Sequence, residues 1–341
     1  MANPPQPRPY LPMDGLKGYQ LACQNLLLGK DNSALKANRV ATIASLGGSG
    51  ALRVGAEFIH QWFPEAKIYV SDPTWGNHIS IFAGAGFEVK TYPYYDSATV
   101  GIKFDELKTF LQQLDAGSII LLHPCCHNPT GVDPTHAQWD ELLNIIKEKQ
   151  LIPFMDIAYQ GFGDDMDTDA YAIRKAVDLG LTVFISNSFS KSLSLYGERV
   201  GGLSIVCPTA DEAKLVQSQL RFTVRRLYSN PPSHGGYIVD TIMNDPSLFH
   251  QWQQEVYAMR DRIQQMRQKL QNILNTKIPT RDFSYFTKQR GMFSFTGLTP
   301  QQVERLQTEF GIYMVENGRM CIAGLNNSNI DYVANAIAEV L

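Results

Sequence analysis

The residue most capable of covalent chemistry is Lys191, in the segment SNSFSKSLSLYGERVGG (186–202). This lysine follows an apolar, strand-like run and stands among serines and glycines. A single lysine after a strand is usually a solvated surface residue. A partly desolvated lysine instead has a lowered pKa, and its neutral amine attacks carbonyl groups. The segment therefore predicts a nucleophile for carbonyl compounds.

A carboxylate interrupts the apolar run LIPFMDIAYQ (151–160) at Asp156. A charge inside such a run loses its water and persists only with a partner of opposite charge. The structural alternative is a carboxylate that caps a turn, but lone buried aspartates are rare. We expect Asp156 to pair with a cation, and a protonated ring nitrogen of a ligand meets this requirement.

The segment SLGGSGAL (45–52) links a strand-like run to a helix-like run. Glycines allow a ligand to approach the backbone, and the N-terminus of a helix offers free N–H groups to a phosphate. The alternative is a plain glycine turn between strand and helix. The spacing matches neither a Walker A loop nor the dinucleotide motif G-x-G-x-x-G. A phosphate site at Gly48 and Ser49 is the functional interpretation.

Two further strand-like runs end in residues that suit a ligand site. Trp75 follows the first of them, in SDPTWGNH (71–78), and an indole at that place can stack on a flat ligand. A tryptophan in the core or in an interface is an equal alternative. Asn128 places an amide after the second run, in HPCCHNPTG (123–131).

The same segment gathers two cysteines and two histidines, a composition typical of zinc sites. We expect no metal there, because the adjacent Cys125 and Cys126 would point to opposite faces of a strand.

These residues must be positioned by the elements between residues 40 and 207. Apolar runs at 66–72, 87–95, 118–126, 151–160, 182–190 and 202–207 alternate with helical patterns such as 133–149 and 168–179. This order is typical of an α/β fold whose parallel strands are buried on both faces. Ligands of such sheets bind beyond the carboxyl ends of the strands, where the residues named above lie.

From about residue 208 the pattern changes. Long amphipathic helices are expected at 209–226 and 246–275, and short strands follow at FSYF (283–286), GMFSF (291–295), IYMVE (312–316) and GRMCIAG (318–324). We expect helices after Thr299 and at the C-terminus, and so a small α+β domain. The predicted boundaries are an N-terminal extended segment (1–15), a large domain (16–255) and a small domain (256–341).

Composition narrows the function classes. The chain has 341 residues, 44% hydrophobic, with a net charge of −3. That charge gives no electrostatic drive toward nucleic acid or an anionic membrane, and no apolar run reaches the ~20 residues that span a bilayer. The first residues lack the apolar core of a signal peptide. Five cysteines indicate free thiols, so we expect a reducing compartment, the cytoplasm.

Taken together, the motifs resemble the aspartate and aromatic aminotransferases, fold-type I enzymes that use pyridoxal 5'-phosphate. In chain order they are GGSGALR, SDPTWGNH, CCHNPTG, DIAYQGF, SNSFSKSLSLYGERVG, RRLYSNPP, QRGMFSF and GRMCIAG. The resemblance extends from about Leu11 to Leu341. It implies a large domain with a mostly parallel seven-stranded sheet flanked by helices, a smaller α+β C-terminal domain, and a homodimer with shared active sites.

For the cofactor ring, the resemblance implies five roles. Lys191 would form the Schiff base with the cofactor and later move the proton, and Asp156 would keep the pyridine nitrogen protonated. Tyr159 and Asn128 would hydrogen-bond the phenolic oxygen, and Trp75 would stack on the ring. Lys191, Asp156 and Tyr159 are thus the predicted catalytic residues, while Trp75 and Asn128 also border the substrate.

For the cofactor phosphate, the resemblance implies contacts from both subunits. Gly48, Ser49, Ser188 and Arg199 would hold the cofactor phosphate, with Tyr10 reaching it from the other subunit.

Two arginines would bind the substrate. Arg319 would receive the α-carboxylate in a bidentate fork, and Arg225 of the other subunit would pair with a side-chain carboxylate. His123 would act from behind the cofactor ring.

The chain departs from the family at its start. The family carries a further segment before the position of Tyr10, with an arm that clasps the partner and a stretch that closes over the substrate. Here MANPPQPRP stands in its place, so we expect weaker closure, dimerisation and turnover.

Three functions remain open on the sequence. The first is transamination of aromatic or dicarboxylic L-amino acids with 2-oxoglutarate. Another fold-type I reaction, such as β-elimination or decarboxylation, is opposed by the pair Arg225 and Arg319, which suits dicarboxylates. The third is a truncated chain that binds the cofactor but is catalytically impaired.

Overall fold

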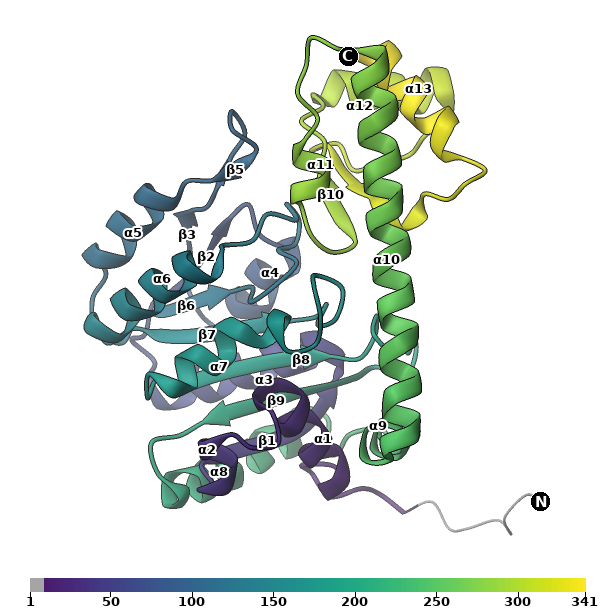
Figure 1. Ribbon diagram of the computed structural model, residues 1–341. Helices are drawn as coiled ribbons and strands as arrows, with labels where there is room; N and C mark the ends of the chain where they lie inside the picture. The colour runs from purple at the N-terminus through teal and green to yellow at the C-terminus, as the bar shows by residue number, and fades with distance from the viewer. Residues whose placement is uncertain (1–8) are drawn as a thin grey trace, which may run out of the picture.

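The computed structural model describes residues 9–341, and within them seven strands form one central sheet (Figure 1). Its strand order is β1-β9-β8-β7-β6-β2-β3, and only β9 runs antiparallel to its neighbours. The strands are β1 (Val40–Leu46), β2 (Ile68–Asp72), β3 (Val89–Pro93), β6 (Ile119–Leu122), β7 (Ile152–Ile157), β8 (Val183–Ser188) and β9 (Val200–Val206). The expected mostly parallel, seven-stranded sheet is confirmed.

Helices cover both faces of this sheet because both faces are apolar. Along β6, Ile119 and Leu121 join one hydrophobic cluster while Ile120 and Leu122 join the other. The helices on the first side are α3 (Gly47–Trp62), α4 (Gly76–Gly84) and α8 (Ala210–Leu227). Those on the second side are α1 (Lys17–Leu28), α5 (Phe104–Gln113), α6 (His136–Glu148) and α7 (Tyr171–Asp178). Strands buried on both faces explain the near-continuous apolar runs of the sequence.

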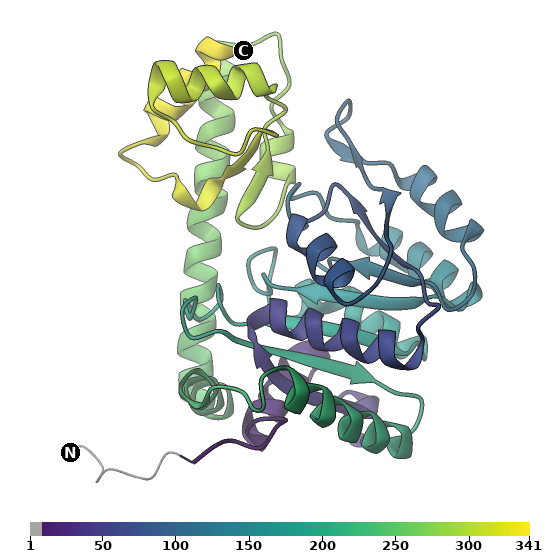
Figure 2. The ribbon, with the colours of Figure 1, turned by 180° about the vertical axis from the view of Figure 1, so that it is seen from behind.

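The small domain is built at one end of a long helix, α10 (Pro246–Lys277), which runs from the large domain to the C-terminal elements (Figures 1 and 2). Its N-terminus is capped by Asp245, which accepts hydrogen bonds from the backbone of Ser247 and Leu248. The C-terminal elements are α11 (Tyr285–Lys288), β10 (Phe293–Phe295), α12 (Pro300–Phe310), β11 (Arg319–Cys321), η2 (Ile322–Gly324) and α13 (Ile330–Val340). The predicted boundary at residue 255 lies inside α10, and the domain limits stay a prediction.

The remaining elements are short connections, apart from the twelve-residue helix α9. They are α2 (Ser33–Lys36), β4 (Tyr95–Asp96), β5 (Gly101–Ile102), η1 (Thr168–Ala170) and α9 (Ser233–Asn244). Across residues 9–341, no helix combines the length and apolar character that a membrane crossing requires.

Two of the strands expected in the small domain are wrong. FSYF (283–286) leads into the helix α11, because Asp282 accepts hydrogen bonds from the backbone and hydroxyl of Ser284 and turns the chain. IYMVE (312–316) pairs with no strand among the described residues and ends in a turn at Glu316, and a strand needs a neighbour for its backbone hydrogen bonds. The segment 1–15 was expected to be extended, and its first eight residues lie outside the described part.

Candidate active site

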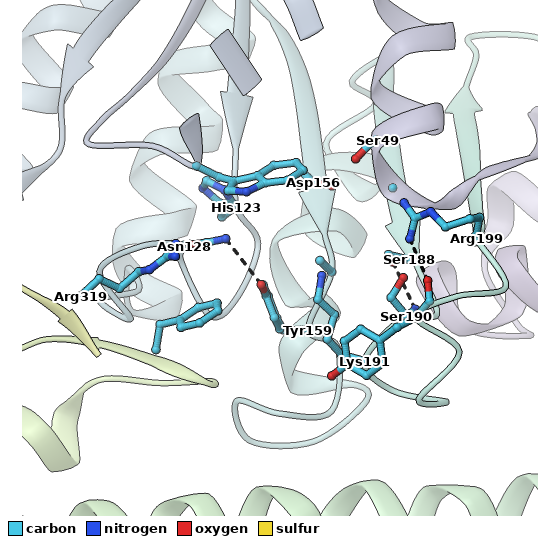
Figure 3. A pocket seen from close by; sticks show the side chains of 15 residues that line it. Ser49, His123, Asn128, Asp156, Tyr159, Ser188, Ser190, Lys191, Arg199 and Arg319 are labelled. Carbon is cyan, nitrogen blue, oxygen red and sulfur yellow. Dashed lines mark hydrogen bonds between the residues drawn. The ribbon is translucent and has the colours of Figure 1, made fainter. Parts of the chain in front are cut away.

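The carboxyl ends of neighbouring strands deliver chemically active side chains to one cavity of about 330 Å³ (Figure 3). Trp75 follows β2, His123 and Asn128 follow β6, and the segments at the ends of β7 and β8 add the central residues. The cavity is lined by Gly48, Ser49, Trp75, His123, Asn128, Asp156, Ala158, Tyr159, Ser188, Ser190, Lys191, Tyr196, Arg199, Phe293 and Arg319. Most of these come from the large domain, whereas the last two belong to β10 and β11 of the small domain.

One end of the cavity is an anion site at the start of α3. Ser49 lies in the first turn of this helix, whose backbone N–H groups have no partners within the helix. Gly47 has a φ of +67°, and a Cβ on it would lie 2.6 Å from Nη2 of Arg199. A glycine is therefore required for the guanidinium to approach the helix start. Hydroxyl groups from Ser188 and Ser190 border the same end.

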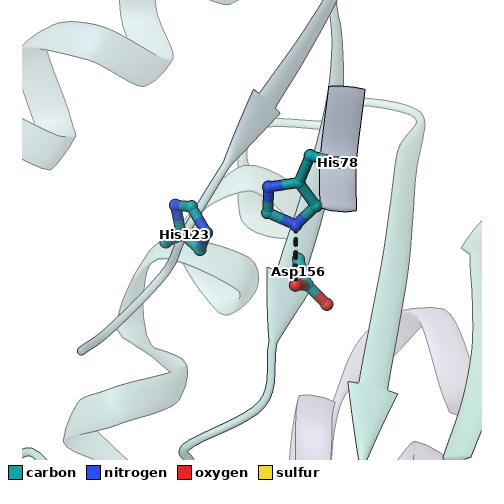
Figure 4. A group of neighbouring side chains, drawn as sticks. All are labelled: His78, His123 and Asp156. Atoms are coloured by element: carbon teal, nitrogen blue, oxygen red, sulfur yellow. Dashed lines mark hydrogen bonds and ion pairs between the residues drawn. The ribbon is translucent and has the colours of Figure 1, made fainter. Parts of the chain in front are cut away.

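Asp156 is buried on β7 and has one oxygen satisfied and one unsatisfied (Figure 4). Its Oδ2 lies 3.1 Å from Nε2 of His78, and Nδ1 of His78 lies 2.8 Å from Oγ1 of Thr74. Its Oδ1 has no hydrogen-bond partner among the described residues. Such an orphaned, buried carboxylate oxygen indicates a ligand that supplies a positive N–H group.

The charge state of Asp156 supports this interpretation. Burial alone raises the pKa of Asp156, but the hydrogen bond and the Coulombic attraction of His78 outweigh it, so the pKa lies below its ordinary value. The carboxylate is therefore ionised at neutral pH. Burial lowers the pKa of His123 to about 3, so this imidazole is neutral and contributes no charge.

Lys191 faces Tyr159, with its Nζ 4.8 Å from the centroid of the phenol ring. Burial lowers the pKa of Lys191; the charge of Asp156 opposes this shift, and that of Arg199 adds to it. More of this amine is thus neutral near pH 7 than of a solvated lysine. A neutral amine is what the predicted nucleophilic role of Lys191 requires, and that role stays a prediction.

At the opposite end of the cavity, Arg319, Asn128 and Tyr159 form a chain of polar contacts. Nη1 of Arg319 donates to Oδ1 of Asn128 at 3.2 Å, and Nδ2 of Asn128 lies 3.5 Å from the hydroxyl of Tyr159. Asn128 is buried, so its amide is held in place between the two groups.

The cavity is cationic. It contains Lys191, Arg199 and Arg319 against the single carboxylate of Asp156. Among residues 9–341 the two arginines donate to neutral oxygens, of Tyr196 and Asn128 respectively. Unpaired cations at both ends of a cavity suit a ligand, or two ligands, with an anionic group at each end.

Comparison with known proteins identifies the family and the fold. The model of the family described as aminotransferase class I and II matches residues 6–337. The chain belongs to this family. It is 57% identical over 332 residues to the aromatic-amino-acid aminotransferase of Escherichia coli (strain K12). The alignment covers 97% of this chain and 84% of the relative. It is 49% identical over 335 residues to an aspartate aminotransferase of Pseudomonas aeruginosa, covering 98% and 84%.

Solved structures give the same result. The psychrophilic aromatic amino acids aminotransferase from Psychrobacter sp. B6, cocrystallised with aspartic acid, superposes with a TM-score of 0.97 at 69% identity, covering 98% of this aminotransferase and 84% of that chain. An aromatic-amino-acid aminotransferase from Burkholderia pseudomallei, covalently bound to pyridoxal phosphate, has a TM-score of 0.97 at 52% identity, with the same coverage. Relatives named as aminotransferases at this identity favour transamination over the other functions that the sequence left open.

The structure gathers most of the predicted site residues of this aminotransferase and leaves two outside. The eleven that line the cavity are Gly48, Ser49, Trp75, His123, Asn128, Asp156, Tyr159, Ser188, Lys191, Arg199 and Arg319. Tyr10 is 91% exposed, and Arg225 lies exposed near the end of α8, where it donates to Ser229. Neither reaches the cavity of its own chain, and their roles stay predictions.

Sequence reasoning missed four residues near the site. His78 supports Asp156 from behind, and Ser190, Tyr196 and Phe293 line the cavity. His78 had a usable signal, because a helix that starts after Trp75 places it one turn further on, on the side of the sheet. Phe293 had none, since only the packing of the small domain brings it to the cavity.

The prediction that Cys125 and Cys126 point to opposite faces of a strand is wrong. Both follow the end of β6, and Cys126 has a φ of +52°, so the two thiols do not alternate across a strand. Their sulfur atoms and a carboxylate oxygen of Asp169 lie within 4.8 Å of one another. That the chain binds no metal stays a prediction.

Proposed function

We propose that this protein catalyses transamination of aromatic and dicarboxylic L-amino acids, with pyridoxal 5'-phosphate as cofactor and 2-oxoglutarate as amino acceptor. The observation that carries the proposal is the ionised Asp156 with its unsatisfied Oδ1, in the same cavity as the half-buried Lys191. A carboxylate that needs a cationic N–H and an amine that attacks a carbonyl are two requirements of a phosphorylated pyridine aldehyde.

The residues present fit this cofactor. Asp156 would hold a proton on the ring nitrogen, Trp75 would cover one face of the ring, and Asn128 with Tyr159 would donate to its phenolic oxygen. The start of α3, with Ser49, and the side chains of Ser188, Ser190 and Arg199 would hold the phosphate. The cofactor would supply a ring that accepts electrons from the substrate Cα.

The protein's own residues then have distinct tasks. Lys191 would bind the cofactor covalently and, once released by the substrate amine, carry the proton that leaves Cα. Arg319 would bind the α-carboxylate. Asn128, which contacts both Arg319 and Tyr159, would hold this guanidinium in position relative to the phenol. Because every amino acid carries an α-carboxylate, this contact fixes the orientation of all substrates.

A homodimer with shared sites is part of the proposal. Tyr10 and Arg225 are exposed, and each would reach the cavity of the second copy, Tyr10 at the phosphate and Arg225 at the side chain of a dicarboxylic substrate. Phe222, one turn before Arg225 on the same helix, is 68% exposed. We also place the protein in the cytoplasm, since its five cysteines are free thiols.

Substrate choice tests the proposal. Arg225→Ala should lower kcat/KM for aspartate by about 10²-fold and change it little for tyrosine, because only aspartate carries a second carboxylate that would lose its partner. Arg319→Ala should lower kcat/KM for both amino acids by about 10²-fold. Steady-state kinetics with each donor and 2-oxoglutarate measure this.

The neighbouring Arg226 is an exposed arginine on the same helix, so Arg226→Ala is the matched control and should behave as wild type. Equal losses of kcat/KM for aspartate and tyrosine in Arg225→Ala would refute the proposal that Arg225 binds the side-chain carboxylate of the substrate. A wild-type protein that transaminates neither donor would refute the proposed function.

Cofactor affinity tests the contact behind the ring. In His78→Leu the carboxylate of Asp156 loses its hydrogen bond and its pKa rises, so its charge is held less firmly and it attracts the ring N–H more weakly. We expect pyridoxal phosphate to bind about tenfold more weakly. Equilibrium titration followed by cofactor absorbance measures this, with the exposed His234→Leu as control. Unchanged affinity in His78→Leu would show that this histidine does not support Asp156.

A further inference from the structure

We propose that Phe293 is a positioning residue for this reaction, because its ring clamps the guanidinium of Arg319 in the orientation that receives the α-carboxylate. The inference rests on the proposed function and extends it. Cζ of Arg319 lies 4.7 Å from the centroid of the Phe293 ring, which is within the range of a cation–π contact. Phe293 and Arg319 both line the candidate active site, and Figure 3 labels Arg319 beside Asn128.

The register of the small sheet makes this contact possible. In the antiparallel pair β10–β11, Phe293 is opposite Cys321 and Phe295 is opposite Arg319. Phe293 and Arg319 are therefore diagonal neighbours, a separation that an aromatic ring and a long side chain can bridge. The guanidinium is thus held by two neutral groups, the ring on its face and Oδ1 of Asn128 on Nη1.

A second cavity explains why the guanidinium of Arg319 needs to be held in place. An apolar cavity of about 540 Å³ lies in the small domain next to the active site, and Phe293 and Arg319 line both cavities. The arginine therefore has space on both sides, and no carboxylate among residues 9–341 pairs with it. Without the ring, the side chain can swing toward the second cavity and away from the substrate.

The backbone of Phe293 is itself fixed by a buried arginine of α10. Arg267 is 2% exposed, and its Nη2 donates to the carbonyl oxygens of Phe293 and Gly291, each at 2.8 Å. Its Nη1 donates to the carbonyl of Phe286 at 2.9 Å and to the hydroxyl of Ser294. A buried guanidinium whose hydrogen bonds all go to one segment holds that segment rigidly.

The ring is also fixed on the side of the large domain. Tyr159 meets Phe293 edge-on, with centroids 6.1 Å apart and planes at 86°. The ring is therefore held between Tyr159 and Arg319, and a side chain of similar volume without the π-system would keep the packing but lose the attraction for the cation.

The experiment uses the holoenzyme and a carboxylate that cannot react. A related aromatic amino acid aminotransferase has been solved with 3-indolepropionic acid, which carries the carboxylate but no amino group. The variants are Phe293→Met, which keeps the volume, and Phe293→Tyr, which keeps the ring. We expect the dissociation constant of this acid to rise about tenfold in Phe293→Met and to stay within about threefold of wild type in Phe293→Tyr.

Two further readouts separate positioning from general damage. Cofactor absorbance and cofactor content should be those of wild type in both variants. KM should rise by the same factor for aspartate and tyrosine, since Arg319 binds the α-carboxylate that both amino acids carry. Should Phe293→Met fail to fold, Phe293→Leu carries the same expectation.

Unchanged affinity for 3-indolepropionic acid in Phe293→Met, in a holoenzyme that transaminates, would overturn the clamp and leave the proposed function intact. Equal weakening in Phe293→Tyr and Phe293→Met would also overturn it, because the ring would then not matter. A wild-type protein that takes up no pyridoxal phosphate would overturn the proposed function and this inference together.

Discussion

Lys191→Ala should remove the covalent link between the protein and pyridoxal phosphate and lower kcat by at least about 10⁴-fold. Among residues 9–341, the lining of the cavity includes no second amine, since its other cations are the guanidinium groups of Arg199 and Arg319. A guanidinium stays protonated at neutral pH and is a poor nucleophile. Wild-type holoenzyme treated with borohydride should retain the cofactor after denaturation, whereas the variant should lose all of it. Mass spectrometry of the denatured chains measures the difference.

The variant should fold as wild type does. Among residues 9–341, Lys191 forms no ion pair, and its amine lies near the like charge of Arg199. Removing a partly desolvated cation from such a place costs little stability. Lys214→Ala on α8 replaces an exposed lysine and is the matched control, which should keep both the borohydride-stable link and the activity. A reducible adduct at full yield in Lys191→Ala would show that the nucleophile lies elsewhere.

The sequence predicted the large-domain part of the site because local pattern and topology agree there. Trp75, Asn128 and Lys191 each follow an apolar run, and Asp156 lies near the end of another. Parallel strands place their carboxyl ends at one edge of the sheet. No information beyond strand order is needed to bring such residues together. The glycine turn before α3 is equally local, since the strand, turn and helix are consecutive.

The small-domain part could not be predicted in the same way. Arg267 belongs to a helix rich in Gln and Arg that reads as amphipathic, and nothing in its neighbours marks it as fully buried. Phe293 reaches Arg319 through a sheet register, and the second cavity depends on packing between α12, α13 and β11. IYMVE (312–316) is a short apolar run with the β-branched and aromatic residues of a strand, but a strand also needs a partner, which its own residues do not specify.

The cysteines show how one wrong element changes a site prediction. Their exclusion as joint ligands assumed a strand through residue 126, but β6 ends at Leu122, just before His123-Pro124. Pro124 has no N–H to donate to the ladder, so a boundary there was foreseeable. The left-handed conformation of Cys126, which brings the thiols together, was not.

Asp156→Asn should bind pyridoxal phosphate and lose most of its activity, with kcat lower by about 10²–10³-fold. The amide has the size of the carboxylate and keeps a hydrogen bond to His78, so the cavity should retain its shape. It carries no charge, however, and cannot hold a proton on the ring nitrogen. Since a neutral pyridine withdraws electrons weakly, removal of the proton from the substrate Cα slows. Single-turnover kinetics with tyrosine, followed by cofactor absorbance, measure this step directly.

The pH dependence gives a second expectation. The pKa of Asp156 in the folded protein lies below its ordinary value, so its carboxylate stays ionised, and its stabilising contribution is lost only as the pH falls through that lowered pKa. Titration of this group should therefore not limit the wild-type rate between pH 6 and pH 8, which a pH–rate profile tests.

A cofactor analogue separates charge from geometry. Pyridoxal phosphate methylated on the ring nitrogen carries a positive charge that needs no proton. If Asp156 acts by maintaining that charge, the analogue should raise the rate of Asp156→Ala, whose small side chain leaves room for the methyl group. It should give no gain in the wild-type protein, where the methyl group crowds the carboxylate. Near-native turnover of Asp156→Asn with the natural cofactor would refute the role of the carboxylate. A slow variant that the analogue fails to improve would place the defect in the position of the ring instead of its charge.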